Sequence, residues 1–284
     1  MRAIRQYDLD QAMTFSYQSD DDGRIKNVVI IENSDFEGTA WEYQLTMTDA
    51  DSETNTDGGK AMQIFWNNDS VKGIAILKPY NINRASNDEW SGENTMFRID
   101  YSEAGTDYEA EMTVYISGLV LPDPTVGDNK FAMETLKMFA GRKGNIIDVY
   151  GNSNHPNANF FDDNTGFNWA FIASGDENSD IGVAEVGLPP STLNETDRNV
   201  ILKDYSVYNV FYNQLTALGY NDTDIQIYLV NTQAPGYFTA NGFLSAGTSP
   251  GTSYDEIETS MNTLSPYNPV QISNLVIEFK NDAS

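Results

Sequence analysis

Apolar and polar residues alternate along the first 120 residues of the chain. A period of two places every second side chain on the same face, as in a strand with one buried face. In 40–48, for example, Trp41, Tyr43 and Leu45 alternate with polar residues. The pattern predicts seven strands, over 13–17, 25–31, 40–48, 60–66, 71–78, 96–101 and 107–116.

The segments between these strands are rich in Gly, Asn and Asp, which favour turns. Because short turns join consecutive strands, the strands should be antiparallel neighbours in a meander. Such a meander can curl into a half barrel that encloses a core or a ligand pocket. The longest break, 79–95, exceeds a hairpin loop, and loops of this length are often functional or mobile.

The second half of the chain mixes helical and extended patterns. The helices expected there are 130–140, 204–218 with Gly219 as its stop, and 254–264, which Ser253 and Glu256 would open as a capping box. The strands expected there are 145–151, 167–174, 181–188, 224–230 and 270–279.

These patterns predict an α+β fold. An N-terminal antiparallel β-meander over 1–120 is followed by a mixed α/β part over 130–284, with a boundary near 119–129. If the final strand pairs with the first sheet, the two parts form a single domain.

Charge and composition exclude several classes of function. The 284 residues contain 16 Lys and Arg against 42 Asp and Glu, a net charge of −26, so nucleic acid is not an expected partner. The absence of Cys excludes thiolate catalysis, Cys-ligated metals and disulfides. With one His, the chain cannot build a two-His metal site.

No stretch approaches the roughly 20 apolar residues of a transmembrane helix. The first 18 residues lack the apolar region of a signal peptide, and we expect that such a segment precedes the native domain. The acidic Asn-rich turns and the Tyr- and Trp-rich strands resemble secreted or lipid-anchored surface proteins of Bacteroidetes-type bacteria. This resemblance implies an extracellular or cell-surface location, with a lipid-bearing Cys upstream of the domain.

Calcium is a candidate metal, because several loops are rich in acidic residues. Ca²⁺ takes six to eight oxygen ligands from carboxylates and carbonyls. The candidate ligands are Asp49, Asp51 and Asp57 in one loop, and Asp162 and Asp163 in another. The first loop is not an EF-hand, since its Gly comes late and Lys60 stands where a bidentate Glu is needed. No other cofactor is expected.

Aromatic side chains in polar loops are the features most suggestive of a ligand site. Trp41, Trp66 and Trp169 lie on predicted strands and are expected in the core. Trp90 and Tyr80 lie in the long loop with Asn83, so rings and an amide could meet a sugar there. These three are the predicted ligand-binding residues.

No catalytic residue is predicted. His155 is expected to be a loop residue, and Ser153 lies too close along the chain to be an evident partner. The leading hypothesis is therefore a non-catalytic extracellular binding protein for a glycan or another small ligand. Two alternatives remain: a glycoside hydrolase with paired carboxylates, and a structural or assembly component of the cell surface.

Overall fold

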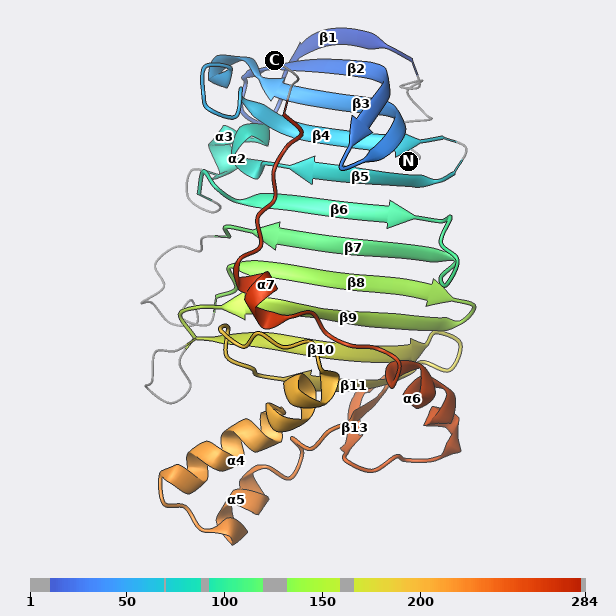
Figure 1. Ribbon diagram of the computed structural model, residues 1–284, viewed down its shortest axis with the longest axis vertical. Helices are drawn as coiled ribbons and strands as arrows, with labels where there is room; N and C mark the ends of the chain where they lie inside the picture. Colours follow the sequence, from blue (N-terminus) through green and yellow to red (C-terminus); the bar gives the residue numbers. More distant parts are fainter. Residues whose placement is uncertain (1–10, 69, 88–91, 120–131, 159–165, 282–284) are drawn as a thin grey trace. The chain divides into compact units, whose positions relative to one another are not determined.

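The computed structural model describes the chain apart from residues 1–10, 69, 88–91, 120–131, 159–165 and 282–284 (Figure 1). The chain divides into two compact units. The first unit joins Met1–Thr106 and Ala110–Pro122 with the C-terminal residues Val276–Ser284. The second unit consists of Asp107–Glu109 and Asp123–Leu275.

Thirteen strands form an antiparallel sheet whose strand order is the chain order, which confirms the β-rich α+β class. All seven strands predicted in the first 120 residues are present. They are β1 (Met13–Gln18), β2 (Ile25–Phe36), β3 (Thr39–Asp49), β4 (Lys60–Asn67), β5 (Lys72–Leu77), β6 (Met96–Ser102) and β7 (Ala110–Ser117). Among the described strands β1 pairs with β2 alone, so the sheet of this unit does not close into a barrel.

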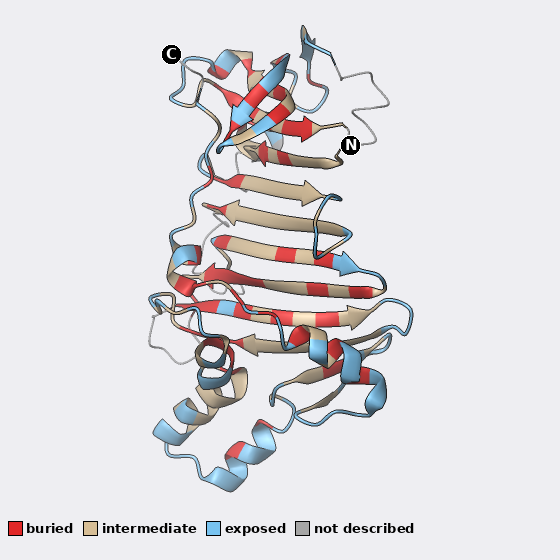
Figure 2. Cartoon of the chain, turned by 45° about the vertical axis from the view of Figure 1, so that its right-hand side comes forward, coloured by how far each residue is buried: buried red, intermediate tan, exposed pale blue. Residues whose placement is uncertain are grey.

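The sheet of the first unit is strongly twisted (Figure 2). It has an apolar core on each face. On one face, Trp66 packs with residues of β2 and β3, namely Val28, Ile30, Leu45 and Met47. On the other face, Phe65 of β4 and Ile76 of β5 pack with Phe36 and Trp41. Trp66 and Trp41 are 0% and 6% exposed, which confirms that these two indoles belong to the core.

The C-terminal residues of the chain complete the second of these cores. Ile277 and Phe279 pack against Phe65 and its neighbours. The backbone N–H of Lys280 donates to Gln63 Oε1 at 2.7 Å, and its ammonium donates to Ser34 Oγ at 2.8 Å. The last segment thus covers a sheet face more than 200 positions earlier in the sequence.

The second unit contains the other six strands. They are β8 (Thr135–Lys143), β9 (Ile146–His155), β10 (Phe167–Asp176), β11 (Ile181–Gly187), β12 (Gly236–Thr239) and β13 (Gly242–Ala246). Its helices are the π-helix η3 (Asn199–Asp204), α4 (Val207–Ala217), α5 (Asp222–Tyr228), the 3-10 turn η4 (Thr252–Tyr254), α6 (Asp255–Met261) and α7 (Pro269–Ser273).

Helices α6 and α7 cover one face of this sheet. Ile257 and Met261 of α6 pack on Ile172 of β10 and Val183 of β11. Helix α7 is held by the hydroxyl of Thr135, which donates to the Ile272 carbonyl at 2.8 Å. The opposite face of β8–β11 is half-buried.

Three predictions for the second half are wrong. The helix predicted over 130–140 is wrong, because residues 135–140 belong to β8, where side chains alternate between the two faces. The strand predicted over 224–230 is wrong, because residues 224–228 belong to α5, which Asn221 caps by accepting a hydrogen bond at Oδ1 from Asp224 N at 3.1 Å. The predicted strand 270–279 is instead the end of α7 followed by an extended segment without strand pairing.

The helices expected over 204–218 and 254–264 are confirmed as α4 and α6. Ser206 caps α4, and Gly219 follows it at φ 86°. The capping box is wrong, because α6 is entered through η4 and no side chain caps it. The long loop 79–95 contains two short helices, α2 (Pro79–Ile82) and α3 (Arg84–Asn87). No helix of the described residues is long and apolar enough to cross a membrane.

Candidate functional site

An open cleft of about 650 Å³, named the Arg198 cleft below, lies in the second unit, beside β11 and the start of α4. Most side chains that line it are amides, hydroxyls or charged groups. The lining residues are Glu185, Arg198, Asn199, Leu202, Lys203, Ser206, Tyr208, Asn209, Gln233, Ala234 and Asn262. A cleft with this lining suits a polar ligand better than an apolar one.

An ion pair joins three elements at this cleft. Arg198 Nη2 lies 2.8 Å from Glu185 Oε2, and the two side chains are 17% and 18% exposed. The same nitrogen donates to Asn262 Oδ1 at 3.2 Å, and Nη1 donates to the Met261 carbonyl at 3.3 Å. The guanidinium therefore holds β11, the start of η3 and the end of α6 in a fixed relationship.

The turn from η3 into α4 is determined by short-range contacts. Gly187, at the end of β11, lets the backbone of Ile201 approach closely, since a Cβ there would overlap the Ile201 carbonyl. Ser206 then starts α4 by accepting a hydrogen bond from Asn209 N at 3.2 Å. Asn209 Nδ2 donates to the Lys203 carbonyl at 2.6 Å, which closes the junction. π-helical turns of this kind often occur at functional sites.

Tyrosine rings extend from the cleft along α4. Tyr208, which lines the cleft, stacks on Tyr212 with ring centroids 5.7 Å apart. The Tyr212 hydroxyl donates to Asp222 Oδ1 at 2.8 Å, and this hydrogen bond raises the pKa of Tyr212. None of the residues of α4 is fully buried, and Tyr208 and Tyr212 are half-buried.

The prediction from sequence did not select this cleft. The helical spacing of Tyr205, Tyr208 and Tyr212 was a signal for it. The lining residues come from four segments between positions 185 and 262, and their meeting depends on the tertiary fold.

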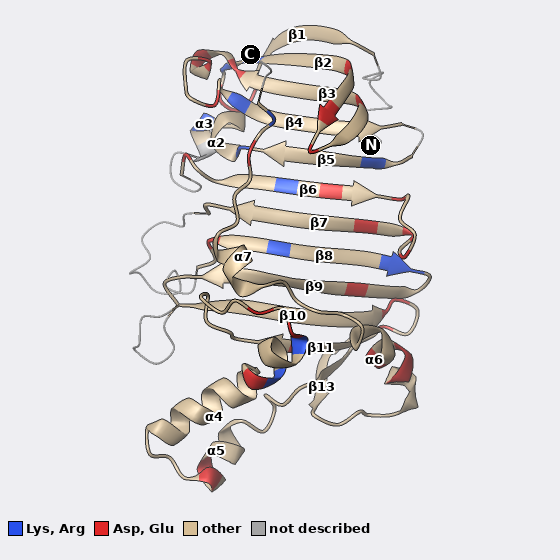
Figure 3. Cartoon of the chain, viewed as in Figure 1, with Lys and Arg blue, Asp and Glu red and all other residues tan. Residues whose placement is uncertain are grey.

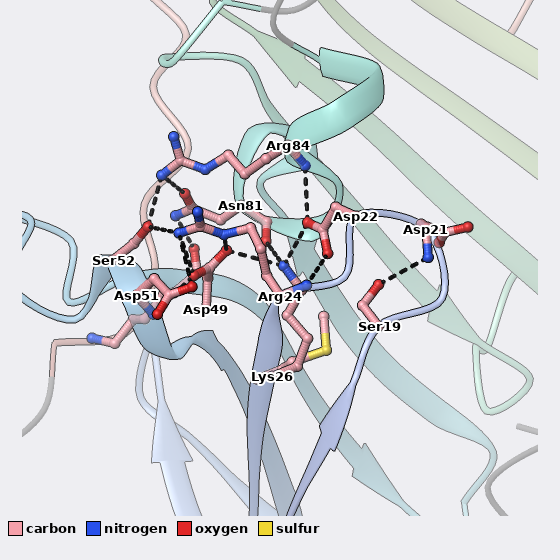
Figure 4. A network of polar contacts seen from close by, with 12 residues as sticks. Ser19, Asp21, Asp22, Arg24, Lys26, Asp49, Asp51, Ser52, Asn81 and Arg84 are labelled. Carbon is pink, nitrogen blue, oxygen red and sulfur yellow. Dashed lines mark hydrogen bonds and ion pairs between the residues drawn. The ribbon is translucent and has the colours of Figure 1, made fainter.

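A buried cluster of charges is the most densely bonded polar feature described in the first unit (Figure 4). The ammonium of Lys26 lies 3.0 Å from Asp22 Oδ2, Asp49 Oδ2 and the Asn81 carbonyl. The side chains of Lys26, Asp22 and Asp49 are 1%, 1% and 0% exposed. Charges buried in this way are stable only when each has its partners.

Two arginines complete the cluster. Arg24 Nε lies 2.6 Å from Asp49 Oδ2, and the Arg84 backbone N–H donates to Asp22 Oδ2 at 3.0 Å. Burial by itself would raise the pKa of Asp22, but hydrogen bonds from Arg84 and Lys26 outweigh it and bring the pKa to about 2. For Asp49, burial is likewise outweighed by Arg24 and Lys26, and the pKa is lowered. The cluster joins β2, β3 and α2–α3, and its bonding indicates a structural role.

Two of the three predicted ligand-binding residues, Tyr80 and Asn83, lie in or directly after α2. The guanidinium carbon of Arg84 lies 3.8 Å from the Tyr80 ring centroid, so one face of that ring is covered. Asn83 ends α2, and its backbone N–H donates to the Pro79 carbonyl at 3.0 Å. Trp90 lies outside the described residues. A ligand site formed by these three residues remains a prediction.

The five candidate calcium ligands differ in their partners and in their exposure to solvent. Asp49 is paired with Arg24 and Lys26, and Asp57 Oδ2 lies 2.6 Å from Lys78 Nζ. Asp51 is an exposed residue 3.9 Å from Arg24, and Asp162 and Asp163 fall outside the described residues. Within the described part of the chain, no three acidic or His side chains form a metal-binding group. Calcium binding remains a prediction.

The side chains of Ser153 and His155 contact each other directly. Ser153 Oγ lies 2.8 Å from His155 Nε2, because residues two apart on β9 share a face. Describing His155 as a loop residue was wrong, since β9 continues to it, and its ring stacks on Phe167 at 5.3 Å. Neither residue lines the Arg198 cleft, and we assign them no catalytic role.

Comparisons with family models, with curated proteins and with solved structures gave no match to this chain. The resemblance to bacterial surface proteins therefore remains a prediction from the sequence.

Proposed function

We propose that the protein is a non-catalytic binding protein of the cell surface or the extracellular space. Its ligand is a saccharide or another small hydroxylated molecule, and the Arg198 cleft is the binding site. The observation that carries this proposal is the lining of the cleft, which combines a tyrosine ring with amides from three separate segments.

The cleft has a suitable size and chemistry for such a ligand. Its volume of about 650 Å³ is within the range of small-molecule sites. Tyr208 offers a ring face against which a sugar can stack. The hydrogen bonds within the protein use Asn209 Nδ2 and Asn262 Oδ1, so Asn209 Oδ1 and Asn262 Nδ2 can serve hydroxyl groups. Because the Arg198–Glu185 pair is already held in place, ligand binding requires little reorganisation.

Glycoside hydrolysis is less well supported by this cleft. The mechanism uses two carboxylates on either side of the scissile bond. Among the described residues that line the cleft, Glu185 is the one carboxylate, and it is paired with Arg198. Binding without turnover is the simpler use of these groups.

The proposal is tested by screening the protein against immobilised polysaccharides and measuring each positive by calorimetry. Tyr208→Ala should weaken binding by about 5- to 140-fold, because stacking of a ligand ring on an aromatic side chain contributes on the order of 1–3 kcal/mol. Tyr220→Ala removes a half-exposed tyrosine outside the cleft and should leave the affinity unchanged.

Tyr80→Ala distinguishes this site from the one predicted at α2. Loss of binding in Tyr80→Ala with full binding in Tyr208→Ala would move the site to the first unit. Retention on none of the polysaccharides, and no heat with any of them, would contradict the proposal.

A further inference from the structure

The half-buried face of β8–β11 carries almost no charge. Among the described residues, η3, α6 and α7 pack on the other face, through residues such as Ile172 and Val183. Helix α4 covers the half-buried face at one end only, where Val210 and Phe211 pack near Phe167. Lys137, Asp148 and Glu185 also belong to that covered face, as their strand registers show. Most of the length of β8–β11 is uncharged (Figure 3). On the uncovered face of these strands, Arg142 is the one charged residue, and Trp169 is 38% exposed. The expectation that Trp169 lies in the core is therefore wrong.

Three of the four strands segregate large and small side chains on this face. Strand pairing places Met138, Phe171 and Val186 in one row across the sheet, and Trp169 lies one row further out. Toward the other end of the same strands lie Ala140, Ala173 and Ala184 in one row, followed by Gly175. On β9 the order is reversed, with Gly151 in the first row and Val149 in the second, so each strand has one larger and one smaller residue in these two rows.

We propose that this face binds a second copy of the same chain, sheet against sheet. The two-fold axis would lie between the two sheets, perpendicular to the strands and midway between the Phe171 row and the Ala173 row. It would reverse the strand direction of one copy relative to the other. Phe171 would then pack on Ala173 of the second copy, Met138 on its Ala140, Val186 on its Ala184 and Trp169 on its Gly175. Each contact occurs twice, as in any isologous interface, and each joins a large residue to a small one.

Charge supports a second copy as the occupant. Two molecules of net charge −26 repel each other, and any contact between carboxylates adds to the repulsion. The uncovered face of β8–β11 contains no acidic residue, so two copies can meet there without burying like charges. Since it has one basic residue, the face is also poorly suited to anionic lipid.

The size of the face predicts a weak dimer. Four strands about 4.8 Å apart, with about seven residues each at 3.3 Å, cover roughly 400 Å² in projection. This is below the roughly 800 Å² per partner of a standard stable interface. Association should therefore be concentration-dependent, and added salt should strengthen it by screening the repulsion.

Sedimentation velocity of the full chain over a range of concentrations tests the proposal. We expect a monomer–dimer equilibrium that shifts toward dimer between low and moderate salt. Phe171→Glu and Ala173→Lys should each abolish it, whereas Gln271→Glu, an exposed change on α7, should not. Circular dichroism shows whether each variant is folded.

Mixing the two charged variants gives the sharpest test. In a mixed dimer, the carboxylate introduced by Phe171→Glu in one copy faces the ammonium introduced by Ala173→Lys in the other, so the two variants together should restore association. A wild-type chain that stays monomeric at all concentrations would overturn the proposal. So would a dimer that survives both single variants, or binding of the face to neutral lipid vesicles without self-association.

Discussion

Lys26 Nζ lies 3.0 Å from Asp49 Oδ2, and the two side chains are 1% and 0% exposed. Lys26 is on β2 and Asp49 ends β3, so the pair ties two neighbouring strands to each other. Arg24 and Asp22 surround the pair (Figure 4). The first unit therefore contains a cluster in which Asp22, Arg24, Lys26 and Asp49 each have a partner of opposite charge.

Lys26→Met should destabilise the first unit by about 3–5 kcal/mol, because it leaves Asp22 and Asp49 buried without their ammonium. Urea unfolding followed by the fluorescence of the buried Trp66 measures the loss. Lys143→Met removes an exposed lysine and should change the free energy of unfolding by less than about 0.5 kcal/mol. A small effect of Lys26→Met would show that water reaches the cluster.

The first unit should also be sensitive to acid. The folded pKa of Asp22 is about 2, below its ordinary value of 3.8, so its contribution to stability is present above about pH 4 and is lost as the pH falls toward 2. The loss from this group amounts to about 2 kcal/mol. Asp49, whose pKa is also lowered, adds to the loss in the same direction. Unfolding curves collected between pH 6 and pH 2 measure it, and Asp22→Asn should flatten the dependence.

The end of the chain should stabilise the beginning. Ile277 is 7% exposed and packs with Phe65 and Ile76, so Ile277→Ala should cost about 2–4 kcal/mol. Val276 is 72% exposed, and Val276→Ala is the matched control with little expected change. Urea unfolding compares the two variants, and equal stability would show that 276–280 contributes nothing to the first unit.

Gly187 should be required for the shape of the cleft. A Cβ at this position would overlap the Ile201 carbonyl, so Gly187→Ala should displace η3 and destabilise the second unit by about 1–3 kcal/mol. A Cβ on Gly182 of the same strand would make an ordinary contact, at 3.7 Å from Ser174 O. Gly182→Ala should therefore keep the wild-type melting temperature, and a loss as large as that of Gly187→Ala would contradict this account.

The strands of the first unit could be predicted because alternation and turn residues agree there. In β3, for example, Leu45 and Met47 are buried in one core, as the alternation implies. Short segments of the second unit were ambiguous. Ile225, Ile227 and Leu229 suggested a strand, yet Ile225 and Leu229 are buried on one face of α5 and its continuation, while Ile227 is 67% exposed.

The candidate sites were harder to predict than the fold. Residues such as Glu185, Arg198 and Asn262 have no common motif and meet through the packing of β11, η3 and α6. The partners of Asp49 were equally hidden, because Arg24 and Lys26 reach it across the β2–β3 pairing. In both cases the chemistry depends on contacts between segments distant in sequence.

Hydrogen–deuterium exchange with a polysaccharide fragment from the screen tests the central claim most directly. The account predicts slower exchange in peptides that cover 198–209 and 231–236, which line the Arg198 cleft, and unchanged exchange in 79–87. Protection confined to 79–87, or equal exchange everywhere with ligand bound, would contradict the assignment of the cleft as the binding site.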